Sequence, residues 1–98
     1  MNRQNALTLL SGNYDYIRKN FSVSRLSIFG SVARNQAAEK SDIDILVEFS
    51  GKATFDNFMN LKFYLQDILH IGVDLVTQKA LRPQIREEIE KELINVPR

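Results

Sequence analysis

The segment FGSVARNQAAEKSDIDILVEF, residues 29–49, decides the fold, because it carries the chain from one strand through a short helical turn into the next. We expect the first of these strands to begin at Arg25, since the residues up to Gly30 alternate briefly and then stop at a glycine. Ser31 opens a short run of good helix formers. Residues 42–49 are rich in β-branched residues, with polar residues at every second early position, which predicts a second strand.

Further elements extend outward from this segment on both sides. Apolar residues recur at helical spacing over residues 5–21, although Gly12 weakens or kinks that run. After the segment, the same spacing predicts a helix over residues 54–71, and a short apolar stretch predicts a strand over residues 73–77. A last amphipathic helix is expected over residues 81–93.

This order of elements predicts one α/β domain over residues 1–98, built as a small mixed β-sheet with flanking helices. An entire helix separates the second strand from the third, which is the connection that parallel neighbours require. The first two strands must be antiparallel if Ser31 is to meet the aspartates at the start of the second. A length of 98 residues is close to the usual size of a single domain.

Composition excludes several classes of function. Apolar residues make up 44% of the chain and charged residues 26%, as in ordinary globular proteins. A net charge of +1 gives no case for direct nucleic-acid binding, which needs a clearly basic domain. The chain has no cysteine for a disulfide or a thiolate zinc site, and no apolar run is long enough to span a membrane. We therefore expect a cytoplasmic protein with no membrane contact.

Three aspartates form the chemical centre of the sequence. Asp42 and Asp44 are two residues apart on a predicted strand, so both point to the same face, where ionised carboxylates repel unless a cation lies between them. Asp74 stands early on the third strand, and a parallel arrangement brings it to the same edge. Hard oxygen ligands suit Mg²⁺. The pattern predicts a magnesium site at these three residues, with Asp74 as the candidate that activates an attacking hydroxyl group.

The turn at Gly30 and Ser31 is suited to a chain of phosphates. Glycine lets the backbone approach a ligand closely, and the amide groups that open the following helix can bind an anion together with the Ser31 hydroxyl. Arg34 lies one helical turn further on and adds a positive charge. Three carboxylates beside a phosphate-binding turn indicate phosphoryl or nucleotidyl transfer.

These motifs resemble those of the DNA polymerase beta-like nucleotidyltransferases, and specifically the minimal nucleotidyltransferases (MNT), whose signature is Gly-Ser followed by an Asp-x-Asp strand. The resemblance covers roughly residues 5–95. It implies the polymerase beta-like fold, triphosphate binding at Gly30 and Ser31, and magnesium binding by the aspartates. It also adds Lys40 and Ser41 as phosphate contacts.

Short members of this family are similar to the antitoxin halves of HEPN/MNT toxin–antitoxin pairs, in which the HEPN partner is an RNase. The resemblance implies an antitoxin of a type VII-like system that uses magnesium to move AMP from ATP to a tyrosine of its toxin, in a hetero-oligomer with that toxin. Asn35 departs from the pattern, because many relatives carry glycine there; asparagine tolerates left-handed backbone geometry. Two alternatives stay open, namely an antitoxin that acts by binding alone and a small-molecule nucleotidyltransferase.

Each motif also has an ordinary structural interpretation. Asp42 and Asp44 could be edge-strand charges that discourage aggregation, and Arg34 could be a solvated helix residue. His70 has no matched nucleophile or metal partner in the sequence, which favours a structural role. The mixed charges over residues 86–92 are typical of the solvated face of a helix and need no function.

Overall fold

A four-stranded mixed sheet lies at the centre of the computed structural model, which describes residues 1–38 and 41–97. The strand order is β3-β2-β1-β4. The strands are β1 (Val23–Phe29), β2 (Ile43–Phe49), β3 (Val73–Thr77) and β4 (Ile94–Asn95). β1 runs antiparallel to both β2 and β4, whereas β3 runs parallel to β2. The predicted fold class, including the directions of the first three strands, is confirmed.

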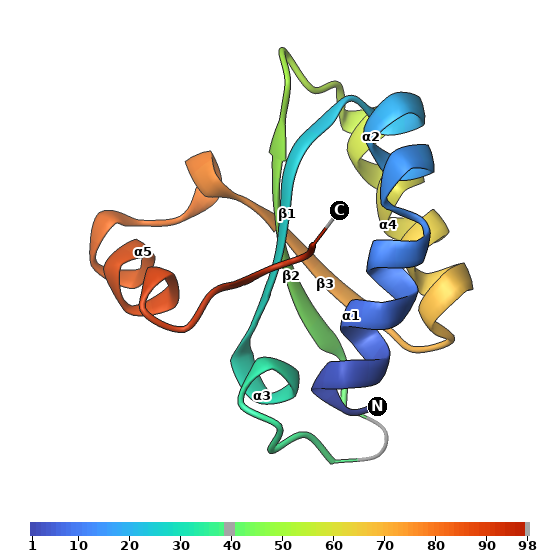
Figure 1. Cartoon of the computed structure of the whole chain (residues 1–98). Helices are drawn as coiled ribbons and strands as arrows, with labels where there is room; N and C mark the ends of the chain where they lie inside the picture. Colours follow the sequence, from blue (N-terminus) through green and yellow to red (C-terminus); the bar gives the residue numbers. More distant parts are fainter. Residues whose placement is uncertain (39–40, 98) are drawn as a thin grey trace.

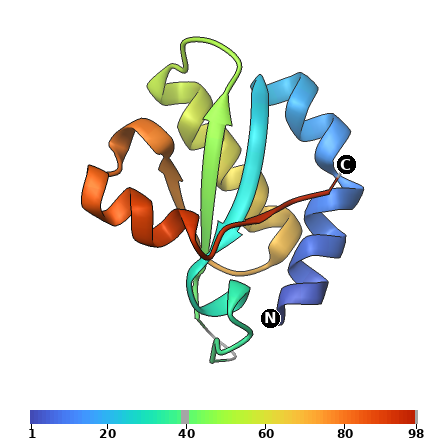
Figure 2. The same ribbon diagram turned by 60° about the vertical axis from the view of Figure 1, so that its left-hand side comes forward.

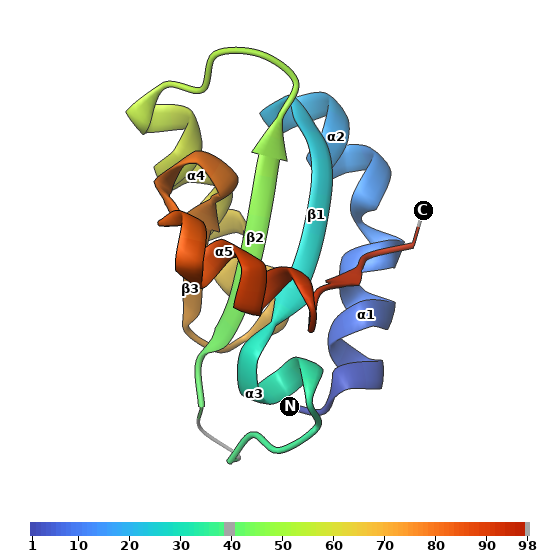
Figure 3. The same cartoon turned by 90° about the vertical axis from the view of Figure 1, so that its left-hand side faces the viewer.

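Helices cover the two faces of the sheet unequally. The helices are α1 (Arg3–Gly12), α2 (Tyr14–Phe21), α3 (Gly30–Ala33), α4 (Phe55–Leu69) and α5 (Pro83–Glu90), with a short 3-10 helix η1 (Gln78–Ala80). Figures 1 and 2 show α1, α2 and α4 packed together on one side of the sheet. On the other side α5 alone crosses in front of the strands, as seen face-on in Figure 3.

The alternation of side chains in β2 separates the core from the face that α5 crosses. Ile43, Ile45 and Val47 are each 0% exposed and belong to the core that the sheet forms with α1, α2 and α4. Because successive side chains of a strand point to opposite faces, Asp44 and Leu46 point to the face that α5 crosses. The carboxylate of Asp44 therefore lies on the sparsely covered side of the sheet.

Several details differ from the predicted elements. β1 begins at Val23 rather than at Arg25, and the last helix, α5, ends at Glu90 rather than at residue 93. The helix expected over residues 5–21 is two helices, which meet at Asn13, one residue after the glycine expected to weaken the run. The Asn13 side chain donates to the Leu9 carbonyl and accepts from the Tyr64 hydroxyl at 3.1 Å, which fixes the break. The sequence pattern missed η1 and β4. No helix of the part of the chain that the structure describes is long and apolar enough to cross a bilayer.

Candidate active site

The strand register brings two of the predicted carboxylates side by side. Asp44 pairs with Asp74 across the parallel β2–β3 ladder and with Phe29 across the antiparallel β1–β2 ladder. Neighbouring strands lie about 4.8 Å apart, so the two carboxylates can interact directly. Asp42 precedes β2 by one residue and is exposed, as is Asp74. Phe29 is followed at once by Gly30, so the Gly-Ser turn and the carboxylates meet where β1 ends and where β2 and β3 begin.

Two glycines make room for the carboxylates. Gly30 has a positive φ of 73°, and a Cβ atom at this position would overlap the Asp44 carboxylate. At Gly72, just before β3, a Cβ atom would overlap the carboxylate of Asp42. The sequence analysis did not single out Gly72 as a site residue. Its position against Asp42 depends on the parallel β2–β3 pairing, which local sequence does not reveal.

The Gly-Ser turn is a single turn of helix, α3, and hydrogen bonds from α1 hold its far end. Ser31 is half-buried in its first turn, where backbone N–H groups have no partner within the helix. Asn35 follows with φ of 60°, the left-handed geometry that the residue type permits. Arg3 of α1 donates to the Ala33 carbonyl at 3.2 Å and, through its backbone N–H, to Asn35 Oδ1 at 3.3 Å. The start of α1 thus supports the end of the turn.

Arg34 is not a free cation in this structure. Its Nη1 atom lies 2.9 Å from Glu92 Oε2, and its Nε atom donates to Gln36 Oε1 at 3.2 Å. The Gly30 backbone N–H donates to the other oxygen of the same carboxylate, Oε1, at 3.2 Å. Glu92 therefore belongs to the candidate site, and the interpretation of residues 86–92 as a solvated face was wrong for this residue.

The structure says less about the two remaining predicted phosphate contacts, Ser41 and Lys40. Ser41 is half-buried, and its hydroxyl oxygen accepts the Ala38 backbone N–H at 3.1 Å. The Ser41 N–H donates in turn to the Ala38 carbonyl at 3.1 Å, so two hydrogen bonds join these residues just before β2. Lys40 lies outside the residues that the structure describes.

Burial and neighbouring charge raise the pKa of the Asp44 carboxyl. Burial raises its pKa above the ordinary value of 3.8, and the charge of Asp74 together with a side-chain hydrogen bond to it acts in the same direction. Asp42 adds a smaller increase, and the Arg34 guanidinium opposes these effects. A bound cation would relieve this repulsion.

An all-oxygen donor set of this kind fits Mg²⁺. In residues 1–38 and 41–97, no three acidic or histidine side chains lie close enough together to hold an ion by themselves. Magnesium usually takes one or two carboxylates and completes its shell with water and substrate phosphates. The arrangement therefore suits an ion that shares its ligands with a nucleotide.

Replacing Asp44 by asparagine should raise the free energy of unfolding of the metal-free protein at neutral pH. Because the folded-state pKa is raised, ionised Asp44 opposes folding above that pKa, and the penalty disappears as the pH falls through it toward 3.8. Water screens the partly exposed group, so we expect a gain below about 1 kcal/mol. Thermal unfolding in EDTA should show a Tm difference at pH 7 that shrinks at pH 4. A variant less stable than wild type at pH 7 would contradict this.

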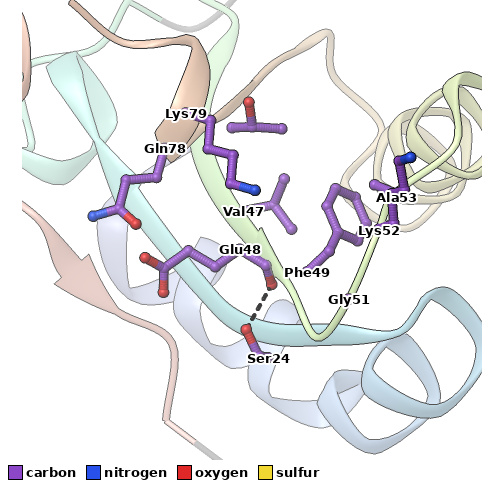
Figure 4. Close-up of a pocket in the computed structure, with 10 residues that line it drawn as sticks. Ser24, Val47, Glu48, Phe49, Gly51, Lys52, Ala53, Gln78 and Lys79 are labelled. Atoms are coloured by element: carbon purple, nitrogen blue, oxygen red, sulfur yellow. Dashed lines mark hydrogen bonds between the residues drawn. The ribbon is translucent and has the colours of Figure 1, made fainter.

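A separate cavity of about 460 Å³ lies toward the other end of β2. Figure 4 shows its lining, which comes from the end of β2, from residues 51–53 after it and from Gln78 and Lys79 of η1. The Ser24 hydroxyl donates to the Glu48 carbonyl at 3.0 Å. Its volume would suit a small ligand. None of the predicted site residues lines it, and it lacks a carboxylate pair, so the aspartates are the better candidate for an active site.

Comparisons with known proteins show which family the chain belongs to. Residues 14–96 match the sequence profile of the family described as "Polymerase beta, Nucleotidyltransferase". The chain belongs to this nucleotidyltransferase family. MJ0128 of Methanocaldococcus jannaschii, named as a candidate protein adenylyltransferase, is 47% identical over 81 residues, which cover 82% of this chain and 83% of that protein. The protein adenylyltransferase MntA of Thermococcus cleftensis is 34% identical over 89 residues, which cover 91% and 90% of the two chains.

Solved structures of nucleotidyltransferases share the fold. A structure described as a candidate minimal nucleotidyltransferase superposes with a TM-score of 0.82 at 33% identity, covering 96% of this chain and 95% of that one. Two toxin–antitoxin structures are more distant. One, determined with AMP-PNP, has a TM-score of 0.73 at 18% identity and covers 89% and 72% of the two chains. The other, a tri-AMPylated HEPN toxin of Shewanella oneidensis with its MNT antitoxin, has a TM-score of 0.66 at 17% identity and covers 93% and 71%.

Proposed function

We propose that this nucleotidyltransferase moves AMP from ATP to a tyrosine of a cognate HEPN-family RNase toxin and so acts as the antitoxin of a type VII-like pair. The observation that carries the proposal is the in-register pair Asp44 and Asp74 beside the Gly30 turn. Relatives of the chain that are named protein adenylyltransferases support the reaction, and the MNT antitoxin found with a tri-AMPylated toxin supports the partner.

The triphosphate of ATP would bind at the turn. The backbone N–H groups at the start of α3 and the Ser31 hydroxyl donate to phosphate oxygens, and Arg34 supplies a positive charge. Asp42, Asp44 and Asp74, together with phosphate oxygens of the nucleotide, would hold magnesium, which when bound supplies positive charge that offsets both the carboxylates and the triphosphate.

Transfer then takes place at the α-phosphorus atom. The tyrosine oxygen forms a new bond to this atom, the bond from it to the bridging oxygen of the β-phosphate breaks, and pyrophosphate leaves. Asp74 is the candidate acceptor for the tyrosine proton, because its carboxylate is exposed at the sheet edge beside Asp44. The hydroxyl loses its proton as the new bond forms.

A protein acceptor is compatible with how open the site is. Asp42 and Asp74 are both exposed, and α5 alone crosses this face of the sheet (Figure 3). A tyrosine on the surface of a folded partner can therefore approach the carboxylates. ATP and an RNase that acts on cellular RNA would both be met in the cytoplasm, where we place the reaction.

The test is transfer of label to a co-purified HEPN partner in the presence of magnesium. ATP labelled at the α-phosphate should label a tyrosine of the partner, EDTA should prevent this, and ATP labelled at the γ-phosphate should leave the partner unlabelled. Label from the γ-position would indicate phosphorylation instead. No label from either nucleotide, with the toxin still neutralised, would indicate an antitoxin that acts by binding alone.

A further inference from the structure

The carboxylate of Glu92 is bound by two donors of the phosphate turn. Gly30 donates its backbone N–H to Oε1 at 3.2 Å, and Arg34 donates from Nη1 to Oε2 at 2.9 Å. An amide and a guanidinium that hold two oxygens of one anion are the groups that would hold two oxygens of a phosphate. Glu92 is half-buried in this position, with 32% of its side chain exposed.

The chain beyond Glu92 is firmly attached to the sheet. β4 pairs with β1, and the Val96 backbone N–H donates to the Leu26 carbonyl at 2.9 Å. Asn95 Oδ1 accepts from the fully buried Ser27 hydroxyl at 2.7 Å and from Arg25 Nε at 3.1 Å. This anchor begins two residues after Glu92, so it keeps the carboxylate close to the turn.

The chain before Glu92 has little apolar packing and is held mainly by Arg86 of α5, which donates from Nη2 to a carbonyl of η1 at 3.0 Å. α5 has no buried residue, and its Ile85 side chain is 48% exposed. Glu88 and Lys91 form a surface pair at 3.6 Å, with about three quarters of each side chain exposed. Helices with few buried contacts open at low free-energy cost. Glu92 can therefore leave the turn without disturbing the core.

The contact between Glu92 and the turn matters because of its charge. A triphosphate and the Glu92 carboxylate are both anions, and each needs the Gly30 N–H and the Arg34 guanidinium. We propose that Glu92 is an internal competitor of the nucleotide, so that the triphosphate binds at the Gly30–Arg34 turn only when this carboxylate has left it. The inference rests on the proposed function, because it takes the turn to be the phosphate site.

The test compares Glu92→Gln with wild type in calorimetric titrations of magnesium-ATP and of magnesium-tripolyphosphate, a probe without a base. Glutamine keeps the size of the side chain and loses its charge, and hydrogen bonds to charged groups are stronger than neutral ones. We expect Glu92→Gln to bind both probes about tenfold more tightly. Glu88→Gln removes the same charge from the same segment away from the turn, and its affinity should stay within about twofold of wild type.

The outcomes separate this inference from the proposed function. If wild type binds ATP and Glu92→Gln binds it equally or more weakly, Glu92 positions the turn and the inference is wrong, while the function stands. If neither protein binds ATP, both fail. A second measurement needs no variant: the Gly30 amide resonance of ¹⁵N-labelled wild type should shift on addition of magnesium-tripolyphosphate. A Gly30 amide that does not move in protein that binds the probe would overturn the inference.

Discussion

The double variant Asp42→Ala, Asp44→Ala should lose AMP transfer by about a thousandfold or more. Metal-ion catalysis is worth several kcal/mol of transition-state stabilisation, and each 1.36 kcal/mol is a factor of ten in rate. Both carboxylates stand at the edge where β2 begins, next to Gly30 and Gly72. The measurement is the initial rate at which α-labelled ATP labels the partner, at saturating magnesium.

A matched control separates the loss of metal ligands from a general change in charge. Asp15 and Asp67 are exposed aspartates on α2 and α4, on the opposite side of the sheet, so the double variant Asp15→Ala, Asp67→Ala should keep the wild-type rate. Unfolding does not explain the expected loss at Asp42 and Asp44, because removing carboxylates that repel one another favours the fold. Wild-type labelling by the Asp42→Ala, Asp44→Ala variant would contradict the assigned site.

The same variant also tests the choice between catalysis and binding. If neutralisation of the toxin needs AMP transfer, the variant should fail to protect cells while still forming a complex with the toxin. If it protects cells without labelling the toxin, contact alone is sufficient, and the nucleotide site serves another purpose.

The sequence predicted those parts of the fold that have a clear hydrophobic period or a connection that allows only one strand direction. β3 has the predicted bounds, Val73–Thr77, and β2 begins at Ile43, one residue later than expected. The helix between them requires a parallel crossover, and from this alone Asp74 could be expected beside Asp44. Alternation along β2 placed the carboxylate of Asp44 opposite the apolar core.

The parts that sequence missed depend on contacts between distant residues. β4 has two residues, too few for a period, and it forms because the edge of β1 has free backbone groups. Glu92 lies among other charged residues, and nothing local distinguishes it from Glu88, which pairs only at the surface. The strand that follows Glu92 brings it to Gly30, so predicting this contact would have required predicting β4 first.

Replacing Gly30 by alanine should impair both stability and catalysis. Its φ of 73° is the left-handed region, which costs a residue with a Cβ about 1–2 kcal/mol. The new methyl group would also overlap the Asp44 carboxylate, so either the strand or that side chain must shift. A misplacement of about 1 Å at a reacting centre can cost a hundredfold in rate. We expect a loss of about that size in labelling, together with a Tm lower by several degrees.

Variants at two other glycines separate backbone strain from the close approach to Asp44 as causes of the expected loss. Gly51 also has a positive φ, 152°, but its added Cβ would meet nothing within 4 Å, so Gly51→Ala should lower the Tm and leave the labelling rate near wild type. Gly12 ends α1 with open space around it, and Gly12→Ala should raise stability by about 0.5–1 kcal/mol without affecting transfer. If Gly30→Ala behaves like Gly51→Ala, backbone strain is the main effect, and the close approach of Gly30 to Asp44 has no part in catalysis. If Gly30→Ala alone loses transfer, the absence of a side chain at this position keeps the Asp44 carboxylate where the reaction needs it.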